Sequence, residues 1–443
     1  MNPGRILPGQ VTPGKVAQTK PWTVLSQVDA THVDTEPWAM RKLGDSFEAG
    51  AADHHLVAQV RRKPSNKWLT RALGAAQLAG AVAIPAAALL WPPLLLGALF
   101  SPVLALSGLN ELGRANLHRD VGQQPDWRGT RTYNLGDGQL LEASDQTRQP
   151  STAQLVENLT DKARQFPSRF LAVNLAGHGG PTHYGGVAKN TVTEGLLALR
   201  DQRGKKVELL LLEQCRGASL EVLQHLAPTA RFIVASEDLM NVTGLPSGSL
   251  AKALGDDPRQ SAQKLVQLAG GRSGPLSAID THHIPLLAGR VDNLGEALGQ
   301  ALENGHRSQI LDALAATTPL AQAPGPLGAV FNPLVKLRDL GEVLQQLDWH
   351  CTDPAVKQAV EATRQVLEQT VVAQRTDHQH RGFASGISIH LAEPGYCADN
   401  HMALGAPPNW ARFLKQTRPW PMRRFGDAVL RHFWPGNTSS DGG

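Results

Sequence analysis

Two apolar runs, FLAVNLA at residues 170–176 and VELLLL at residues 207–212, decide the fold class of this chain. The first is followed by Gly177-His178-Gly179-Gly180, and the second by Glu213-Gln214-Cys215-Arg216-Gly217. Short apolar runs separated by a helix-length segment are typical of buried parallel strands in an α/β sheet. Reactive side chains collect beyond the carboxyl ends of such strands. The pattern therefore predicts that His178 and Cys215 lie at the same edge of one sheet.

Cys215 and His178 are the residue types of a Cys/His hydrolase. A thiolate is a strong nucleophile, and a nearby His can assist deprotonation of the thiol or protonate the leaving amine. The glycines around His178 leave room for a substrate carbonyl beside main-chain N–H groups. We therefore expect the backbone N–H groups of Gly179 and Cys215 to bind the oxyanion. The alternative is an incidental pair, a buried Cys acting as a small hydrophobe and a loop His.

The order of these motifs resembles that of the clostripain family of caspase-like cysteine peptidases. One strand closes on His-Gly-Gly, a second on acidic-x-Cys, and a third, at residues 232–237, on Ala-Ser-Glu. Three further segments resemble the family's opening strand, post-catalytic motif and late strand, namely Trp22–Leu25, Leu276–Asp280 and Gly386–His390. This combination is more specific than a lone Cys or His. It implies a doubly wound, mostly parallel α/β sheet flanked by helices, and a cysteine endopeptidase acting on peptides or proteins.

Three carboxylates, Glu213, Glu237 and Asp238, are candidates for substrate selection. Glu213 stands two residues before Cys215, where the resembled family commonly has Asp. The resemblance implies that this position lines the pocket for the residue before the scissile bond. A carboxylate there would select Arg or Lys through charge-assisted hydrogen bonds. Glu237 and Asp238 are secondary candidates for the same pocket, and a solvated strand end is the alternative for each.

The chain departs from the resembled family near the nucleophile and in the opening strand. Arg216 and Gly217 follow Cys215 where the family tends to have apolar residues, and the strand at residues 26–29, Ser-Gln-Val-Asp, is more polar than usual. Related peptidases are often activated by self-cleavage between the His and Cys strands. If processing occurs here, we expect a cut after Lys189, at the end of a loop predicted at residues 181–190.

We expect no cofactor and no metal site. The pairs His282/His283 and His378/His380 lack Cys or carboxylate partners at metal-ligand spacing, so packing or surface roles are favoured. Calcium dependence occurs in parts of the resembled family, but the sequence has no EF-hand-type loop. Calcium is therefore left as an open alternative.

An apolar segment interrupts the predicted peptidase domain. Residues 72–110 carry no charged side chain and are broken by prolines around Trp91-Pro92-Pro93. Crossing a bilayer takes about 20 apolar residues, and each half is slightly shorter than that. Arg71 and Arg114 flank the segment, which favours both ends on the cytoplasmic side. We therefore predict a helical hairpin at residues 68–115 that associates with a membrane, either dipping into the bilayer or crossing it as a transmembrane helix. A soluble apolar hairpin packed on the enzyme is the alternative.

Composition excludes several classes of protein. The 443 residues contain 43 basic and 39 acidic side chains, with a formal net charge of +4, so no nucleic-acid partner is expected. The three cysteines, Cys215, Cys351 and Cys397, are too few for a disulfide framework, although a Cys351–Cys397 bridge is an alternative. No apolar signal region follows Met1, so retention in the cytoplasm is the expectation.

The predicted organisation has five parts. They are a disordered lead at residues 1–20, a peptidase domain at 21–250, the hairpin inserted at 68–115, a mainly helical region at 251–435 and a disordered tail at 436–443. A rival function is a membrane-inserting or scaffold protein that reuses the fold without cleavage. A third is a thiol hydrolase of small esters or amides.

Overall fold

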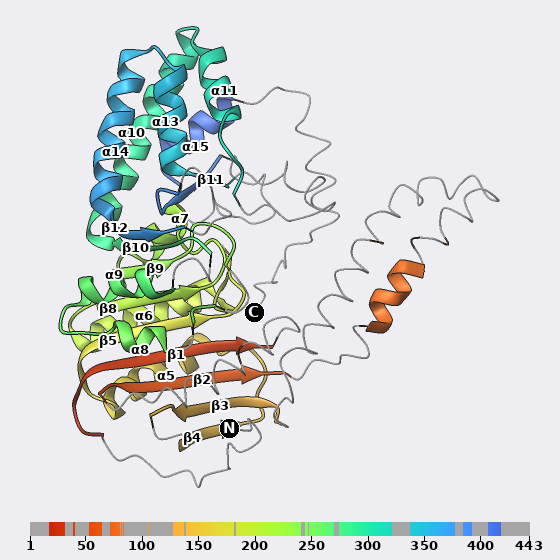
Figure 1. Cartoon of the computed structure of the whole chain (residues 1–443), viewed down its shortest axis with the longest axis vertical. Coiled ribbons are helices and arrows are strands. Elements are labelled where there is room, and N and C mark those ends of the chain that lie inside the picture. The colour runs from red at the N-terminus through yellow and green to blue at the C-terminus, as the bar shows by residue number, and fades with distance from the viewer. Residues whose placement is uncertain are drawn as a thin grey trace.

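The computed structural model has a single large sheet at its centre (Figure 1). It describes residues 17–31, 53–63, 71–79, 127–136, 139–180, 183–240, 244–246, 248–269, 274–320, 337–376, 384–391 and 406–417, with isolated positions 39, 81, 83 and 105. The strands of the large sheet are β1 (Lys20–Ala30), β2 (His55–Arg62), β3 (Gly129–Asn134), β4 (Gln139–Ser144), β5 (Ser168–Ala176), β8 (Val207–Glu213), β9 (Ala230–Ala235), β10 (Leu276–Asp280) and β12 (Val371–Arg375).

The nine strands lie in the order β12-β10-β9-β8-β5-β1-β2-β3-β4. The five central strands, β9, β8, β5, β1 and β2, run parallel, and the two outer strands at each end run antiparallel to their neighbours. The predicted fold class, a mostly parallel caspase-like α/β sheet, is confirmed. Two small antiparallel pairs, β6 (His183–Tyr184) with β7 (Val187–Ala188) and β11 (Leu337–Asp339) with β13 (Ser388–His390), lie outside this sheet.

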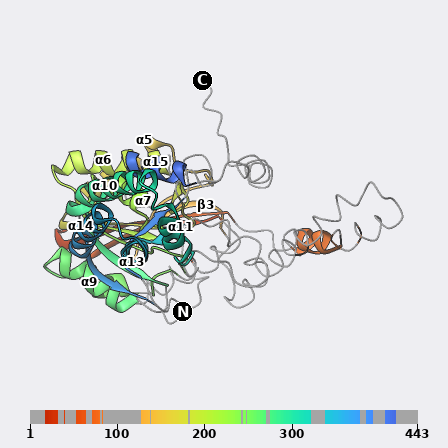
Figure 2. The ribbon, with the colours of Figure 1, turned by 90° about the horizontal axis from the view of Figure 1, so that it is seen from above.

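Helices cover both faces of the sheet, because its central strands are apolar on both sides. In β1, Trp22 and Val24 belong to one core while Leu25 belongs to the other. The first core holds α8 (Ser249–Ala253) and α9 (Pro258–Ala269), and the second holds α5 (Thr152–Gln165), α6 (Lys189–Arg203) and α7 (Leu220–Leu226). Figure 2 shows α6 and α9 on opposite sides of the sheet.

The start of α5 is fixed by its sequence. Ser151 and Gln154, three positions apart, are typical of a capping box. The Ser151 hydroxyl accepts the Gln154 N–H, and the Gln154 side chain accepts the Ser151 N–H at 2.9 Å, which confirms it. Leu155 and Leu159 of this helix are buried against the sheet. Because α5 leads directly into β5, it begins near the edge that carries the carboxyl ends of the parallel strands and ends at the opposite edge.

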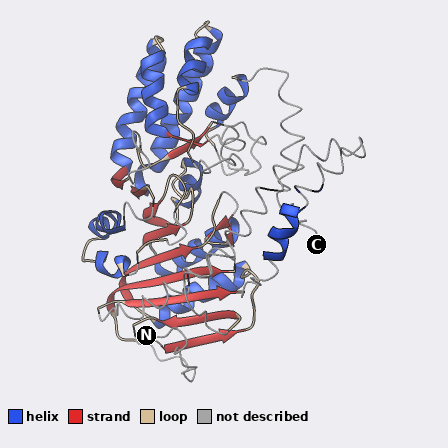
Figure 3. Ribbon diagram, turned by 45° about the vertical axis from the view of Figure 1, so that its right-hand side comes forward, coloured by secondary structure: helices blue, strands red, loops and turns tan. Residues whose placement is uncertain are grey.

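A helical bundle stands beyond the β12 end of the sheet (Figures 1 and 3). Its elements are η3 (Thr281–His283), α10 (Ile284–Glu303), α11 (Arg307–Ala315), α13 (Leu340–His350), α14 (Pro354–Thr370) and α15 (Pro408–Gln416). The last helix lies close to α10, where a side chain at Gly295 would come within 2.4 Å of the Trp410 backbone nitrogen. The buried Trp410 indole in turn donates to the His390 carbonyl at 3.1 Å, which ties α15 to β13.

Several sequence-based boundaries differ from the structure. Apolar residues at helical spacing predict a helix at residues 334–347, but it begins only at Leu340, because residues 337–339 form β11. The same spacing predicts a helix at 356–372, which ends at Thr370, and Val371 starts β12 of the large sheet. In these two cases a short strand directly adjoins a helix, and periodicity does not separate the two. A strand predicted at 383–391 is limited to β13, Ser388–His390.

The predicted hairpin at residues 68–115 falls almost entirely outside the described residues. Residues 71–79 are helical. Across the described part of the chain, no helix is both long enough and apolar enough to cross a membrane. Membrane association through residues 72–110 therefore stays a prediction, as do the disordered tail and most of the disordered lead.

Candidate active site

His178 and Cys215 follow adjacent parallel strands at the same level. Ala176, the last residue of β5, pairs with Glu213, the last residue of β8. The register continues one step further, because the Gly177 N–H donates to the Glu213 carbonyl at 3.2 Å. His178 and Cys215 each stand two residues beyond the paired positions. Adjacent strands lie about 4.8 Å apart, so the structure brings the two predicted catalytic residues to neighbouring loops at one edge.

The Cys215 loop is a tight turn held from two sides. Arg216 has φ of 58°, and it is the one described non-glycine residue in the left-handed region. Its N–H donates to the Asp238 carbonyl at 2.9 Å, and the Ala218 N–H donates to the Ser236 carbonyl at 2.9 Å. The strained turn is therefore pinned to the segment that follows β9. Strained backbone of this kind is common at functional sites.

The Cys215 thiol is half-buried and contacts the main chain of Met240. The Met240 N–H donates to Sγ at 3.3 Å, and Sγ lies 3.7 Å from the Met240 carbonyl oxygen. The N–H supports a thiolate, whereas the carbonyl oxygen would accept from a protonated thiol. The sequence pattern predicts a helix at residues 218–226 whose N-terminus would also favour a thiolate. In the structure α7 begins at Leu220 with Ser219 as its cap, and a backbone N–H from the segment after β9 contacts the sulfur.

Gln214 joins the His178 loop to the Cys215 loop. Its side-chain oxygen accepts the Gly185 N–H at 2.6 Å, and a side chain placed on Gly179 would meet Gln214 atoms at 2.1 to 2.5 Å. The Gly186 N–H also donates to the His178 carbonyl at 2.7 Å. The exposed His178 is therefore held through its backbone by the β6–β7 hairpin. Gly179 has its N–H unbonded to any described residue, which suits the predicted oxyanion role.

Glu213 is buried beneath the nucleophile loop, with both carboxylate oxygens engaged. Oε1 accepts the Asn174 side-chain amide at 2.7 Å, and Oε2 accepts the Leu245 N–H at 2.9 Å. Glu213 is 7% exposed. In this conformation the carboxylate anchors the loop after β9. A basic side chain reaching it would have to share these oxygens with the Asn174 amide and the Leu245 N–H.

The two secondary candidates differ in where they lie. Asp238 is next to the site, because its carbonyl accepts the Arg216 N–H and its Oδ1 accepts the Leu239 N–H at 2.7 Å. Glu237 instead faces the helical region, where its Oε2 accepts the Gly386 N–H at 3.0 Å. Burial, reinforced by the neighbouring Asp339 carboxyl, raises the pKa of Glu237 well above its ordinary value. This shift favours the neutral form, which weakens the case for Glu237 as a partner of a basic side chain.

Lys189 does not lie in an exposed loop. Residues 183–188 form the β6–β7 hairpin, and Lys189 is the first residue of α6. It is half-buried, and burial lowers the pKa of its amine. A cut after Lys189 would require the first turn of α6 to open. Processing at this bond stays a prediction.

The remaining groups do not form a metal site within the described residues, where no group of three or more His, Cys, Asp and Glu side chains is arranged to hold an ion. His282 and His283 contact each other edge to face in η3, with ring centroids 5.2 Å apart. Cys351 is a free, buried thiol in the helical bundle. Burial raises its pKa to about 11, so it is a poor nucleophile.

Sequence reasoning missed Gln214, Asn174 and Met240 as parts of the site. Gln214 and Asn174 are polar residues within or beside otherwise apolar strands, which is a usable signal. Met240 carries no such signal, because its role depends only on its main chain. These three residues connect the dyad loops to each other and to the segment after β9.

Comparison with solved structures identifies cysteine proteases of the same fold. A secreted C11 cysteine protease from Bacteroides thetaiotaomicron, called iotapain, has a TM-score of 0.53 and 12% identity over 91% of this chain and 100% of its own. A secreted C11 cysteine protease from Bacteroides thetaiotaomicron in complex with an irreversible peptide inhibitor has a TM-score of 0.52 and 12% identity, over 90% of this chain and 99% of its own. An inactive zymogen C11 protease from Parabacteroides distasonis has a TM-score of 0.50 and 12% identity, over 85% of this chain and 93% of its own. No protein-family model and no curated protein matches the chain.

Proposed function

We propose that this protein is a cysteine endopeptidase that cleaves peptide bonds after Arg or Lys. The observation that carries the proposal is the placement of His178 and Cys215, level with each other beyond two adjacent parallel strands. The fold it shares with C11 cysteine proteases along most of its length supports this reading. A shared fold alone does not fix chemistry, so the residues of the site carry the assignment.

The proposed mechanism uses groups of this chain alone. The Cys215 thiolate, stabilised by the Met240 N–H, attacks the substrate carbonyl carbon. The developing oxyanion is held by the backbone N–H groups of Gly179 and Cys215. His178 donates a proton to the leaving amine, and the resulting thioester is hydrolysed by water that His178 deprotonates. Through its hydrogen bond from the Gly185 N–H, Gln214 holds the His178 loop and the Cys215 loop in place relative to each other during both steps.

The proposed preference for Arg or Lys rests on Glu213 and Asp238. Both are acidic, both lie against the nucleophile loop, and both are almost fully buried. A carboxylate in such surroundings binds a guanidinium or ammonium group more strongly than one in water. Glu213 has the more direct position, because it lies two residues before Cys215 on β8.

A panel of fluorogenic peptides tests the function. Peptides with Arg, Lys, Asp or Leu before the reporter would be incubated with wild type and with Glu213→Gln, each with and without calcium. We expect cleavage after Arg and Lys only, and about a tenfold or greater loss of kcat/KM for these peptides in the variant, as removing one charge-assisted contact predicts. Equal cleavage of the Leu peptide would contradict the specificity. Hydrolysis of small esters but of no peptide would favour the simple thiol hydrolase.

Adjacent glycines provide a test of the loop geometry. A methyl group on Gly179 would collide with Gln214, whereas one on Gly180 would meet no atom within 4 Å. We expect Gly179→Ala to lower kcat/KM about 100-fold, since small displacements of reacting groups cost rates of that order. Gly180→Ala is the matched control and should retain activity. Equal activities of the two variants would show that the Gly179–Gln214 contact does not position the site.

A further inference from the structure

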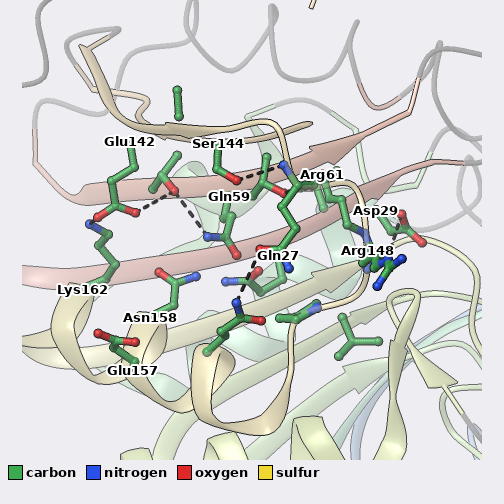
Figure 4. Close-up of a pocket in the computed structure, with 18 of the residues that line it drawn as sticks. Gln27, Asp29, Gln59, Arg61, Glu142, Ser144, Arg148, Glu157, Asn158 and Lys162 are labelled. Atoms are coloured by element: carbon green, nitrogen blue, oxygen red, sulfur yellow. Dashed lines mark hydrogen bonds and ion pairs between the residues drawn. The ribbon is translucent and has the colours of Figure 1, made fainter. Parts of the chain in front are cut away.

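A polar cavity of about 310 Å³ lies beside the proposed active site, on the α5 side of the sheet (Figure 4). Strands β1 to β4 form its floor, and α5 forms a wall. Gly185 and Val187 of the β6–β7 hairpin also line it, so the cavity borders the loop that carries His178. Its size lies at the lower end of the range of small-molecule sites.

The floor of the cavity is a row of polar side chains across four strands. Gln27 of β1 pairs in register with Gln59 of β2, which pairs with Thr132 of β3, which pairs with Glu142 of β4. Gln59 donates to Thr132 at 3.5 Å, and Thr132 donates to Glu142 at 3.4 Å. A sheet face covered by a helix is ordinarily apolar. The unusual polarity of the opening strand is therefore accounted for by this cavity and not by packing.

The charges that line the interior are paired with each other. Asp29 forms a buried ion pair with Arg61 at 3.1 Å, and Glu142 pairs with Lys162. Arg148, Glu157 and Asp161 are exposed at the rim, and Asp161 pairs there with Arg164 at 3.1 Å. Paired charges inside the cavity favour an uncharged occupant, because a net charge bound beside them would have to displace one partner of an existing pair.

Two amides line this cavity, and one of them has unused hydrogen-bonding capacity. Gln27 is only 8% exposed and lies on the floor. The Nδ2 atom of Asn158, on α5, is buried and has no hydrogen-bond partner among the described residues. An unsatisfied buried polar group costs about 1–3 kcal/mol. The Asn158 donor therefore points to an occupant that carries an acceptor, and the Gln27 amide, which has both a donor and an acceptor, lines the same cavity.

The strand order places this cavity on the leaving-group side of the scissile bond. β5, which delivers His178, lies between β8, which delivers Cys215, and β1. Since His178 protonates the leaving amine, the part of the substrate that is carboxyl-terminal to the scissile bond lies next to His178. In the strand order its further residues extend from β5 toward β1 and β2. A direct link exists as well, because Arg61 donates to the Gly186 carbonyl at 3.0 Å and the Gly186 N–H donates to the His178 carbonyl.

We propose that the cavity is a leaving-side subsite that binds one or two uncharged polar residues of the substrate, carboxyl-terminal to the scissile bond. Gln27 and Asn158 hydrogen-bond the side-chain amide or hydroxyl of Asn, Gln, Ser or Thr in this position. The inference rests on the proposed peptidase function and adds to it a preference on the second side of the bond. Nothing in the dyad or in the carboxylates near Cys215 requires this preference.

The experiment compares two kinds of substrate in the full-length protein. A short substrate carries the reporter directly after the scissile bond, and internally quenched substrates carry four leaving-side residues, either rich in Asn and Ser or rich in Leu. The quantity measured is the ratio of kcat/KM for an extended substrate to that for the short one. In wild type we expect the Asn- and Ser-rich peptide to give a higher ratio than the Leu-rich peptide. Gln27→Leu or Asn158→Leu should lower the ratio for the Asn- and Ser-rich peptide about five- to tenfold, as loss of one buried hydrogen bond predicts.

Gln300→Leu, at an exposed position of α10, is the matched control and should keep the wild-type ratio. Thermal unfolding of each variant checks that the fold is retained. Hydrolysis of the short substrate with an unchanged ratio in both cavity variants overturns the subsite while leaving the proposed function in place. Failure of wild type to hydrolyse any of the substrates removes the function and the subsite together.

Discussion

Replacing Cys215 by Ala is expected to lower kcat for peptide hydrolysis by about 10⁴-fold or more, which is the scale seen when a covalent nucleophile is removed. His178→Ala should cost a comparable factor, because the two residues act as a unit and their effects are not additive. The fold should survive both changes, since His178 is exposed and Cys215 is half-buried in a loop. Progress curves with Arg and Lys peptides, measured beside thermal unfolding of each variant, check this.

The chain supplies its own control for the thiol. Cys351 lies in the helical bundle at 1% exposure, and burial raises its pKa to about 11. Cys351→Ala should therefore keep the wild-type kcat, with a modest loss of stability from the small cavity it leaves. Activity that survives in Cys215→Ala and disappears in Cys351→Ala would contradict the assignment of the nucleophile.

Glu221→Gln is expected to change how stability depends on pH. Glu221, on α7, is fully buried, and its Oε1 accepts the His390 N–H at 3.2 Å. Burial raises its pKa from 4.5 to about 7. The folded protein thus holds this proton more tightly than the unfolded chain. The resulting stabilisation is complete below about pH 4.5 and is lost as pH rises toward 7, by about 3 kcal/mol at 1.4 kcal/mol per pH unit.

The free energy of unfolding of Glu221→Gln relative to wild type isolates this effect. His390, whose pKa burial lowers to about 3, acts in the opposite direction, because its contribution is lost as pH falls below about 6.5. The His390 contribution is present in both proteins and cancels when their free energies of unfolding are subtracted. From pH 4.5 to 7 the variant should therefore become increasingly stable relative to wild type. Glu361→Gln, at an exposed ion pair, is the control, and its free energy of unfolding relative to wild type should not change with pH. If the free energies of unfolding of Glu221→Gln and wild type change with pH in parallel, Glu221 is ionised when buried.

The sequence was sufficient to predict the strands that carry the dyad and the edge at which they end. Runs of apolar residues such as 207–212 have few alternatives in an α/β protein, and the residues after them must lie at the carboxyl edge. The capping box at Ser151 was equally readable, because it depends on residues three apart. Local interactions of this kind are encoded within a few positions.

Long-range contacts were not predictable from the sequence. The Met240 N–H reaches Cys215 across 25 residues, and the Glu237 carboxyl meets Asp339 across the boundary between sheet and bundle. Within the loop expected at 181–190, residues 183–188 form a hairpin whose Tyr184 is fully buried and whose turn residues Gly185 and Gly186 adopt positive φ. Such features depend on which elements pack together, and periodicity carries no information about that.

The polar residues of the opening strand show where sequence and structure complement each other. Gln27 and Asp29 stood out as departures from a buried strand, but only the register across β1 to β4 joins them to Gln59, Thr132 and Glu142. A residue that breaks the local pattern often marks a site. Here the structure identifies the cavity that those residues line.

Covalent labelling tests the central claim most directly. Wild type would be incubated with a peptidyl electrophile that carries Arg or Lys at its reactive end, followed by intact-mass analysis and mapping of the modified peptide. We predict one adduct, on Cys215, that is absent in Cys215→Ala and strongly slowed in His178→Ala and by a competing Arg peptide. Lack of any adduct on Cys215 in the folded wild type, or an adduct that forms equally fast with a Leu or Asp electrophile and without His178, would contradict the account.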